Sequence, residues 1–157
     1  MKIRHSAKAI IIKNGKLLVT ENKDNFGTFY LLPGGGQKHG EDLHQALKRE
    51  CYEEIGIRVE PKELIYLREY IGKNHEFHAF DGDVHKIEYI FLCKPASEDE
   101  PQAGRRPDQY QTGVTWLPLA DLMDYRFYPK AACPLITERF YIKEHIDEQP
   151  VYLGDVN

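Results

Sequence analysis

The sequence predicts a single α/β domain built around a mixed sheet. Apolar and β-branched runs before residue 33 and after residue 56 indicate strands, and a capped amphipathic segment between them indicates a helix. With 157 residues and 41% hydrophobic content, the chain is long enough to bury one core and too short to expect two independent ones. We therefore expect one domain over residues 1–157.

The N-terminal part is predicted to form a β-hairpin over residues 6–20. Its two apolar runs flank Asn14 and Gly15, a pair that tolerates the positive φ of a tight turn. A polar loop is expected at residues 22–28. The segment Pro-Gly-Gly-Gly at residues 33–36 then interrupts regular structure with a backbone that can approach a ligand closely.

A helix is predicted to follow this glycine-rich loop. Asp42 is its expected N-cap, and Gln45 three residues later completes a capping-box pattern. Gly56 is expected to end the helix. Beyond it, the sequence predicts strands at 57–59, 63–71, 85–94 and 114–117, a polar loop at 95–112 and a second long helix at 129–145.

The predicted helix carries two carboxylates on the side that should be buried. With Leu47 at the centre of the apolar face, Glu54 lies about 20° and Glu50 about 60° from that centre. Glu53 and Glu54 also occupy the last turn, where the helix dipole disfavours anions. A hard divalent cation would compensate for these positions, because it prefers oxygen ligands. The alternative is that the glutamates are ordinary solvated side chains.

The spacing of residues around these glutamates decides between the two interpretations. It matches the pattern G-x5-E-x7-R-E-U-x-E-E-x-G-U, in which U is usually aliphatic, at every fixed position. The match is carried by Gly35, Glu41, Arg49, Glu50, Cys51, Glu53, Glu54, Gly56 and Ile57. This pattern is the signature of the Nudix hydrolase family, which the sequence resembles over residues 35–57. Cys51 departs from the usual aliphatic residue but is also a small apolar side chain.

The resemblance implies a fold and a reaction. The fold would be an α/β/α sandwich with the mixed sheet between helices. The reaction would be attack by water on one phosphorus of a pyrophosphate, assisted by Mg²⁺ or Mn²⁺ held by Glu50, Glu53 and Glu54. Glu53 is our first choice for accepting the proton of the water. The alternatives are acidic residues of the polar loop, Glu98, Glu100 and Asp108.

The remaining signature residues would support this site. Arg49, held by Glu41, would orient the acidic side chains of the catalytic centre, because a guanidinium can hold carboxylates in a fixed geometry. Gly35 and Gly36 would let the loop bring backbone groups close to the metal and the substrate. Gly56 would support the end of the helix.

Residues outside the signature are weaker candidates for contacts with the substrate. Arg105 and Arg106 of the polar loop could reach the phosphates, or could be solvated. Tyr30, Phe127 and Tyr128 could stack on a nucleobase, although packing in the core is the commoner role of such side chains.

Composition limits the partners. The net charge of −4 argues against binding a nucleic acid duplex, and no apolar run approaches the ~20 residues of a membrane-spanning helix. The three cysteines suggest neither disulfides nor a thiolate metal site. His75, His78 and His85 could form a transition-metal site, but ordinary hydrogen-bonded histidines are favoured. A cytoplasmic protein is expected, which could pair as a homodimer.

Three functions remain open at this point. The first is metal-dependent hydrolysis of a pyrophosphate bond in a nucleoside diphosphate linked to another moiety, of the NDP-sugar or ADP-ribose type. The second is a MutT-like hydrolysis of nucleoside triphosphates that cleans the nucleotide pool. The third is a nucleotide-sensing Nudix domain without catalysis, which the complete set of signature carboxylates disfavours.

Overall fold

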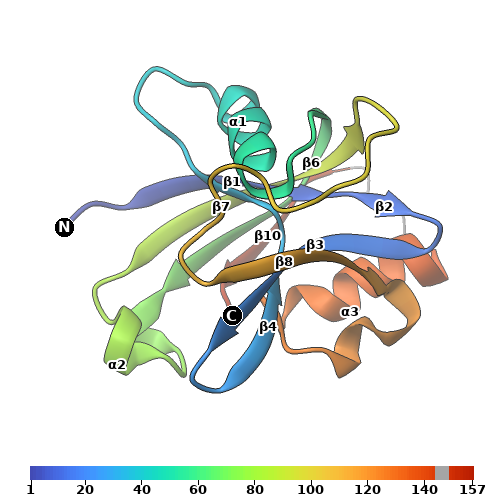
Figure 1. Ribbon diagram of the computed structural model, residues 1–157. Coiled ribbons are helices and arrows are strands. Elements are labelled where there is room, and N and C mark those ends of the chain that lie inside the picture. Colours follow the sequence, from blue (N-terminus) through green and yellow to red (C-terminus); the bar gives the residue numbers. More distant parts are fainter. Residues whose placement is uncertain (144–148) are drawn as a thin grey trace.

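The computed structural model describes residues 1–143 and 149–157 of the chain. Two mixed sheets pack against each other, with α1 above them and α3 below in the view of Figure 1. The first sheet has the strand order β10 (Val151–Asp155), β6 (Val59–Ile71), β7 (His85–Pro95), β1 (Arg4–Ile10), β5 (Gly34–Gly36). The second has the order β2 (Ile12–Lys13), β3 (Lys16–Asp24), β4 (Gly27–Leu31), β9 (Phe127–Tyr128), and β8 (Gln111–Pro118) also pairs with β3.

The helices are few and mostly short. They are α1 (Leu43–Ile55), α2 (His78–Asp81) and α3 (Ala132–Thr137), with 3₁₀ segments η1 (Gly72–Asn74) and η2 (Leu119–Asp124) and a π-helical turn η3 (Glu138–Ile142). Over the residues that the structure describes, no helix is both long and apolar enough to cross a membrane.

Two hydrophobic cores occupy opposite faces of the first sheet. Ala7 and Ala9 of β1 belong to the cluster under α1, together with Leu47. Ile10 belongs instead to the cluster that contains Ile136 of α3, because neighbouring residues in a strand face opposite ways. Helices therefore cover both sides of the sheets, and the predicted α/β class with mixed sheet between helices is confirmed.

The predicted hairpin over residues 6–20 is only partly right. Residues 12–13 and 16–17 do form a tight hairpin around Asn14 and Gly15, which have φ of 53° and 71°. The first apolar run, however, divides between the two sheets: β1 pairs in parallel with β7, about half the chain away in sequence. A local pattern cannot reveal a parallel partner that is so distant.

Other boundaries also differ from the predictions. The expected polar loop at 22–28 is mostly strand, since β3 continues to Asp24 and β4 begins at Gly27. The strands expected at 57–59 and 63–71 fall in one long strand, β6, with register shifts between Pro61 and Tyr66; it begins only at Val59, so positions 57 and 58 are not strand. The second helix begins at Ala132 rather than 129, and positions 144 and 145 of that prediction lie outside the described residues.

Candidate active site

Helix α1 is held at both ends as its sequence predicts. The carboxylate of Asp42 accepts a hydrogen bond from the N–H of Gln45 at 2.7 Å, and the Gln45 side chain accepts one from the N–H of Asp42 at 2.8 Å. At the other end, Gly56 adopts a left-handed φ of 70° and donates its N–H to the carbonyl of Tyr52. The two caps fix the register of the helix and hence the face on which each glutamate lies.

Arg49 ties together the acidic residues on the outer side of this helix. Its guanidinium donates to both carboxylate oxygens of Glu41, at 2.7 and 3.0 Å. It also donates to Glu50 at 2.9 Å, to Glu53 at 3.3 Å and to the carbonyl of Gly36 at 2.9 Å. The hydrogen bond from Arg49 lowers the pKa of Glu41 to about 2. Arg49 thus occupies the position expected of a residue that orients the other carboxylates.

Glu54 is the one signature carboxylate that Arg49 does not reach. Its side chain is 2% exposed, as its place on the apolar face predicts. One oxygen accepts a long hydrogen bond of 3.4 Å from the N–H of Gly34, and the other, Oε1, is buried with no hydrogen-bond partner. Burial raises the pKa of Glu54 to about 8, although nearby Lys8 opposes the shift. Among the described side chains this carboxylate has no ion pair, and its Oε1 is left without the partner that a buried polar atom needs.

The glycines of β5 allow the backbone to lie against these carboxylates. A Cβ atom on Gly35 would lie 2.5 Å from Oε2 of Glu50. A Cβ atom on Gly34, which has a φ of 133°, would lie 2.1 Å from the carbonyl oxygen of Ala7 on β1. Only glycine fits either position without displacing its neighbours. The sequence pattern points to Gly35 and Gly36 for the site but carries no separate signal for Gly34.

The carboxylates fit a hard divalent cation in chemistry, although they do not converge in this arrangement. Among the described residues, no three His, Cys, Asp or Glu side chains are placed together so that they could hold a metal ion. Glu50 and Glu53 are instead drawn to Arg49. The buried, unpartnered oxygen of Glu54 and the oxygen-only ligand set nevertheless suit Mg²⁺ or Mn²⁺.

The loop between β7 and β8, residues 96–110, closes the C-terminal end of α1; it is shorter than the predicted loop at 95–112 because β7 extends to Pro95 and β8 begins at Gln111. The backbone N–H groups of Gln102, Gly104 and Arg106 donate to the last carbonyls of the helix, those of Ile55, Glu54 and Glu53, at 3.0 to 3.1 Å. These bonds satisfy carbonyls that a helix end leaves unpaired. A Cβ on Gly104 would lie 2.1 Å from the carbonyl oxygen of Glu53, so the glycine permits the contact.

This loop brings two sets of predicted residues to the site. Arg105 and Arg106 are exposed beside the end of α1, and their contact with a substrate stays a prediction. Asp108 is close enough to Glu54 to raise the pKa of that carboxyl further, whereas Glu98 and Glu100 are exposed side chains for which the structure gives no such link. Asp108 is therefore the strongest of the three alternatives to Glu53.

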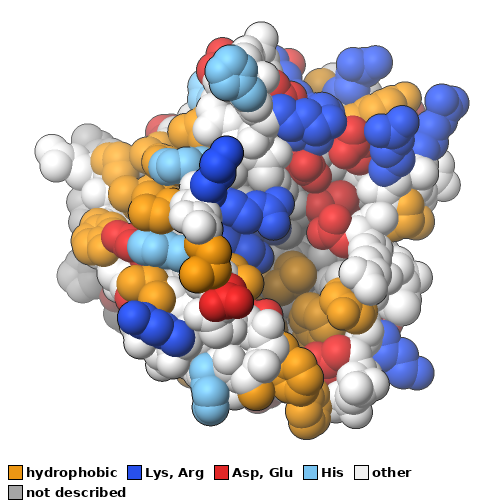
Figure 2. All heavy atoms as spheres, turned by 90° about the vertical axis from the view of Figure 1, so that its left-hand side faces the viewer, with side chains coloured by type: hydrophobic (Ala, Val, Ile, Leu, Met, Phe, Trp, Pro, Cys, Tyr) orange, Lys and Arg blue, Asp and Glu red, His pale blue; other side chains and the backbone are white. Residues whose placement is uncertain are grey.

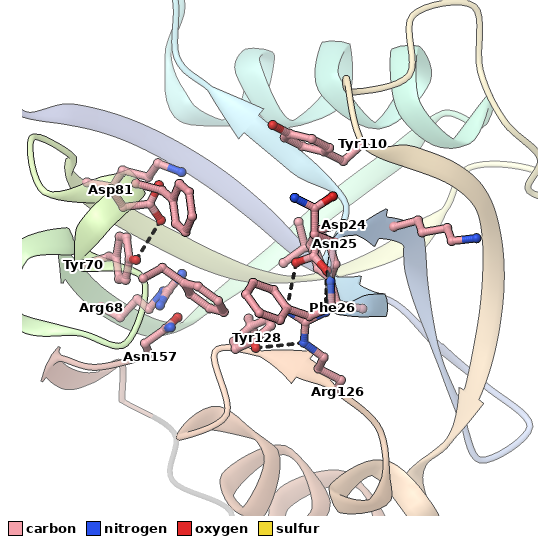
Figure 3. Close-up of a pocket in the computed structure, with 16 residues that line it drawn as sticks. Asp24, Asn25, Phe26, Arg68, Tyr70, Asp81, Tyr110, Arg126, Tyr128 and Asn157 are labelled. Atoms are coloured by element: carbon pink, nitrogen blue, oxygen red, sulfur yellow. Dashed lines mark hydrogen bonds and ion pairs between the residues drawn. The ribbon is translucent and has the colours of Figure 1, made fainter.

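A cavity of about 620 Å³ opens between the two sheets (Figure 3). Arg68, Tyr70 and Asp81 lie on one side of it, with Phe26, Asp24, Arg126 and Tyr128 on the other and Tyr110 above. Of the three aromatic residues predicted to stack on a base, only Tyr128 lines this cavity. Tyr30 faces the core, where its ring lies 5.6 Å from that of Tyr125, and Phe127 is fully buried.

Strand alternation explains which aromatic side chains reach the cavity. Phe29 and Leu31 line it and Tyr30 between them does not, because successive side chains of β4 point to opposite faces. Phe29 is absent from the residues predicted for the site, and the signal that could have found it is this alternation of period two. Using that signal requires knowing which face of the strand is buried in the core.

One wall of the cavity is fixed by Arg126. Its guanidinium forms a two-pronged ion pair with Asp24, at 2.8 and 2.9 Å, and donates to the hydroxyl of Tyr128 at 3.0 Å. The rings of Phe26, Phe29, Phe77 and Tyr128 surround it at 5.2 to 5.9 Å. The hydrogen bond from Arg126 lowers the pKa of Asp24, so the pair stays charged over the ordinary pH range.

A second cavity, of about 590 Å³, lies beside Glu50. Basic side chains and histidines border it, namely Lys2, Arg4, His5, Lys38 and His39. On the face drawn in Figure 2, Lys and Arg side chains gather around a hollow next to Asp and Glu side chains. The acidic protein thus has local positive potential beside Glu50.

The histidines that could have suggested a transition-metal site have ordinary partners. His75 contacts Asp155 at 2.6 Å, His78 contacts the carbonyl of His75 at 3.1 Å and His85 contacts Glu69 at 3.0 Å. Each therefore has a hydrogen-bonding role in the structure, as the favoured interpretation of the sequence expects.

Comparison with known proteins places this site in a family. The model of the NUDIX domain matches residues 3–135. "MutT-like protein" from Streptomyces ambofaciens is 31% identical over 111 residues, which cover 71% of this chain and 60% of that protein. "Nucleoside diphosphate-linked moiety X motif 6" from Xenopus laevis is 31% identical over 81 residues, covering 52% of this chain and 34% of that protein.

Solved structures agree with the match. A MutT NUDIX hydrolase from Burkholderia pseudomallei has a TM-score of 0.67 and 25% identity, over 85% of this chain and 96% of that one. The chain spans only 34% to 60% of the length of the curated relatives it matches.

Proposed function

This chain belongs to the Nudix family, and from that premise we propose that it hydrolyses a pyrophosphate bond in a nucleoside diphosphate linked to another moiety, of the NDP-sugar or ADP-ribose type. The observation that carries the proposal is the carboxylate of Glu54. It is buried on the same helix as Glu50 and Glu53, and its Oε1 has no hydrogen-bond partner among the described residues. Burying a carboxylate oxygen without a partner destabilises the folded protein, so stability alone would favour another residue at this position. A role in function explains why glutamate is found there.

The proposal assigns the metal to the three helix glutamates. Glu50, Glu53 and Glu54 would hold Mg²⁺ or Mn²⁺, and Arg49 would release Glu50 and Glu53 towards it. The bound cation would supply Lewis-acid stabilisation of negative charge on the pyrophosphate oxygens. Lys8 lies near enough to Glu54 to favour its ionised form, which is the form that can act as a ligand.

Glu53 is proposed as the group that takes the proton of the attacking water. Its side chain is 24% exposed, so water can reach it. The proton would rest on the Glu53 carboxylate while the bond between phosphorus and the bridging oxygen breaks. Asp108 is the alternative base, because it is the loop acid with an electrostatic link to Glu54.

The two cavities suggest how the halves of a substrate are separated. The aromatic cavity of about 620 Å³ would receive the nucleoside, since its rings can stack on a base. The basic cavity beside Glu50 would receive the other phosphorylated half. Arg105 and Arg106, at the end of α1, would contact the phosphates that join the two halves of the substrate. The backbone of Gly35 and Gly36 would lie against the same phosphates. Tyr30 would then act only by packing behind this site.

A second candidate function is hydrolysis of nucleoside triphosphates, which the match to a MutT-like protein supports. A nucleotide-sensing domain without catalysis has no comparable support. A cytoplasmic location and a homodimer also belong to the proposal; cell fractionation and size-exclusion chromatography with light scattering would test them.

One experiment tests the proposed reaction. The protein is incubated with Mg²⁺ and, separately, with NDP-sugars, ADP-ribose and nucleoside triphosphates, and the products are separated by anion-exchange chromatography. The expected result is cleavage of a linked diphosphate into a nucleoside monophosphate and a second phosphorylated product. Release of pyrophosphate from triphosphates alone would favour the second candidate. No turnover by the parent, with binding of nucleotides intact, would leave the sensing function.

A further inference from the structure

Two lysines and two arginines line the aromatic cavity, and both arginines already have partners. Arg68 donates to Glu88 and to the carbonyl of Val156. Arg126 is paired with Asp24. These two guanidiniums are therefore occupied in holding the walls of the cavity together, and neither is free to recognise a ligand without breaking an ion pair.

Lys86 is different. It lines the cavity from β7, where it pairs in register with Tyr70 of β6 and Arg4 of β1. Within the described part of the chain, its ammonium makes no hydrogen bond and no ion pair. Burial lowers the pKa of Lys86, and the charge of nearby Glu88 opposes that change. The cavity thus presents a half-buried donor group that the fold itself does not use.

An acceptor lies in the same cavity. The carboxylate of Asp81 accepts one hydrogen bond, from the hydroxyl of Tyr70 at 2.9 Å, and keeps further acceptor capacity. Tyr70 and Asp81 lie on the side of the cavity opposite Phe26 and Tyr128 (Figure 3). A planar ligand between these sides would meet aromatic faces on one side and polar groups at its edge.

Exposed aromatic side chains surround the mouth of this cavity. Phe26 is 70% exposed, Phe80 is 78% exposed and Tyr110 is 56% exposed, and they come from three separate segments of the chain. Large exposed apolar side chains that gather at one opening indicate a surface that a ligand covers. Their rings could close over a base once it has entered.

On the proposed function, which gives this cavity to the nucleoside, we propose that Lys86 makes the site selective for 6-oxopurine nucleotides, those of guanine and hypoxanthine, over adenine nucleotides. An ammonium only donates hydrogen bonds. Guanine offers it two adjacent acceptors, O6 and N7, which is the commonest base contact of lysine and arginine. Adenine places an amino group where guanine has O6, and that donor would oppose the ammonium. Asp81 can accept from the N1–H of a 6-oxopurine, which adenine lacks.

The alternative ligand for Lys86 is an additional anion, such as a phosphate. Asp81 also lines the cavity without a cationic partner among the described residues, and its carboxylate would repel a free anion. The same carboxylate is an acceptor for the N–H groups of a neutral base. The charge distribution around Lys86 therefore favours a neutral ligand with both acceptors and donors on its edge.

Nucleotide binding to the metal-free protein tests this proposal without requiring hydrolysis. Dissociation constants of GMP, IMP and AMP are measured by isothermal titration calorimetry in EDTA. GMP and IMP are expected to bind the parent at least about tenfold more tightly than AMP, as a good base contact would give. Lys86→Met keeps the apolar part of the side chain. It should bring the three dissociation constants to within about threefold of one another, mainly by weakening the binding of GMP and IMP.

Two further variants distinguish base recognition from a general effect of charge. Lys86→Gln should reverse the preference towards AMP, because an amide both donates to N7 and accepts from the amino group of adenine. Lys23→Met removes the exposed lysine at the mouth of the same cavity and should keep the ratio of GMP to AMP affinities.

Equal affinity of the parent for the three nucleotides would overturn the proposal. It would also be overturned if Lys86→Met weakened the binding of GMP, IMP and AMP equally, since Lys86 would then bind the phosphate that all three share. Circular dichroism and thermal melts establish that each variant is folded. If selectivity is present but no diphosphate is hydrolysed, the proposed function fails while the selectivity of Lys86 stands.

Discussion

Replacing Glu54 by glutamine should stabilise the metal-free protein, and the gain should grow with pH. In the folded protein the carboxylate is 2% exposed and one of its oxygens has no partner. Its folded pKa, about 8, lies above the ordinary value of 4.5. Between these two values the folded form binds a proton that the unfolded form has lost, so the stability of the parent falls as pH rises through this window. The Glu54→Gln variant has no titrating group at this position and escapes this loss.

The size of the effect follows from the same pKa. At about 1.4 kcal/mol per pH unit, the rise from 4.5 to about 8 corresponds to roughly 5 kcal/mol over the whole window. The difference between the unfolding free energies of variant and parent should therefore increase by that order between pH 4.5 and 8, and then level off. The buried amide that the substitution introduces changes this free-energy difference by an amount that does not depend on pH. The test is therefore how the difference changes with pH, not its value at one pH.

The assay is urea denaturation in excess EDTA at pH 5, 6, 7, 8 and 9, followed by circular dichroism. Glu63→Gln makes the same chemical change at an exposed position and is the matched control. Saturating Mg²⁺ at pH 8 should then stabilise the parent more than the Glu54 variant, because only the parent keeps the full ligand set. If variant and parent follow parallel pH profiles, the carboxylate has a compensating partner and the reasoning from its burial is wrong.

Three further predictions concern the same site. Excess EDTA should abolish hydrolysis and Mg²⁺ or Mn²⁺ should restore it; full activity in the chelator would contradict the metal assignment. Glu53→Gln should lower kcat by at least about 10²-fold with a smaller change in KM, and a nearly normal kcat would move the base to Asp108. Gly35→Ala would place a Cβ 2.5 Å from Oε2 of Glu50, so kcat/KM should fall by about 10- to 10²-fold in steady-state assays. Gly113→Ala, where the nearest atom is 3.7 Å away, is its control, and equal activities would refute the tight contact.

Much of helix α1 could be predicted, because the contacts within a helix join residues that are close in the chain. The capping pair Asp42 and Gln45, the end at Gly56 and the buried side of Glu54 all follow from spacings of a few residues. The contact of Arg49 with Glu41 was expected from the family resemblance, and its geometry is now given by the structure. The catalytic and metal-binding roles of these residues stay predictions.

The cavity could not be predicted, because strands meet partners that are far away in sequence. Lys86, Phe29 and Tyr128 come from three strands of two sheets, and nothing near them in the chain indicates that they share a space. The alternation of side chains along β4 allows Tyr30 to face either the cavity or the core. Only the packing of Tyr125 against its ring shows that it faces the core.

The sequence by itself therefore determined the chemistry of α1: which residues cap it, which carboxylates it carries and which of them is buried. The reason is that a helix of period 3.6 relates residues that are close in the chain. Only the tertiary structure decided that β1 pairs with β7 rather than with the hairpin that follows it, and that the loop at 96–110 caps α1. These contacts require long segments of chain to be closed into loops, which costs conformational entropy. Strand pairing and burial offset that cost, and neither can be read from a local sequence pattern.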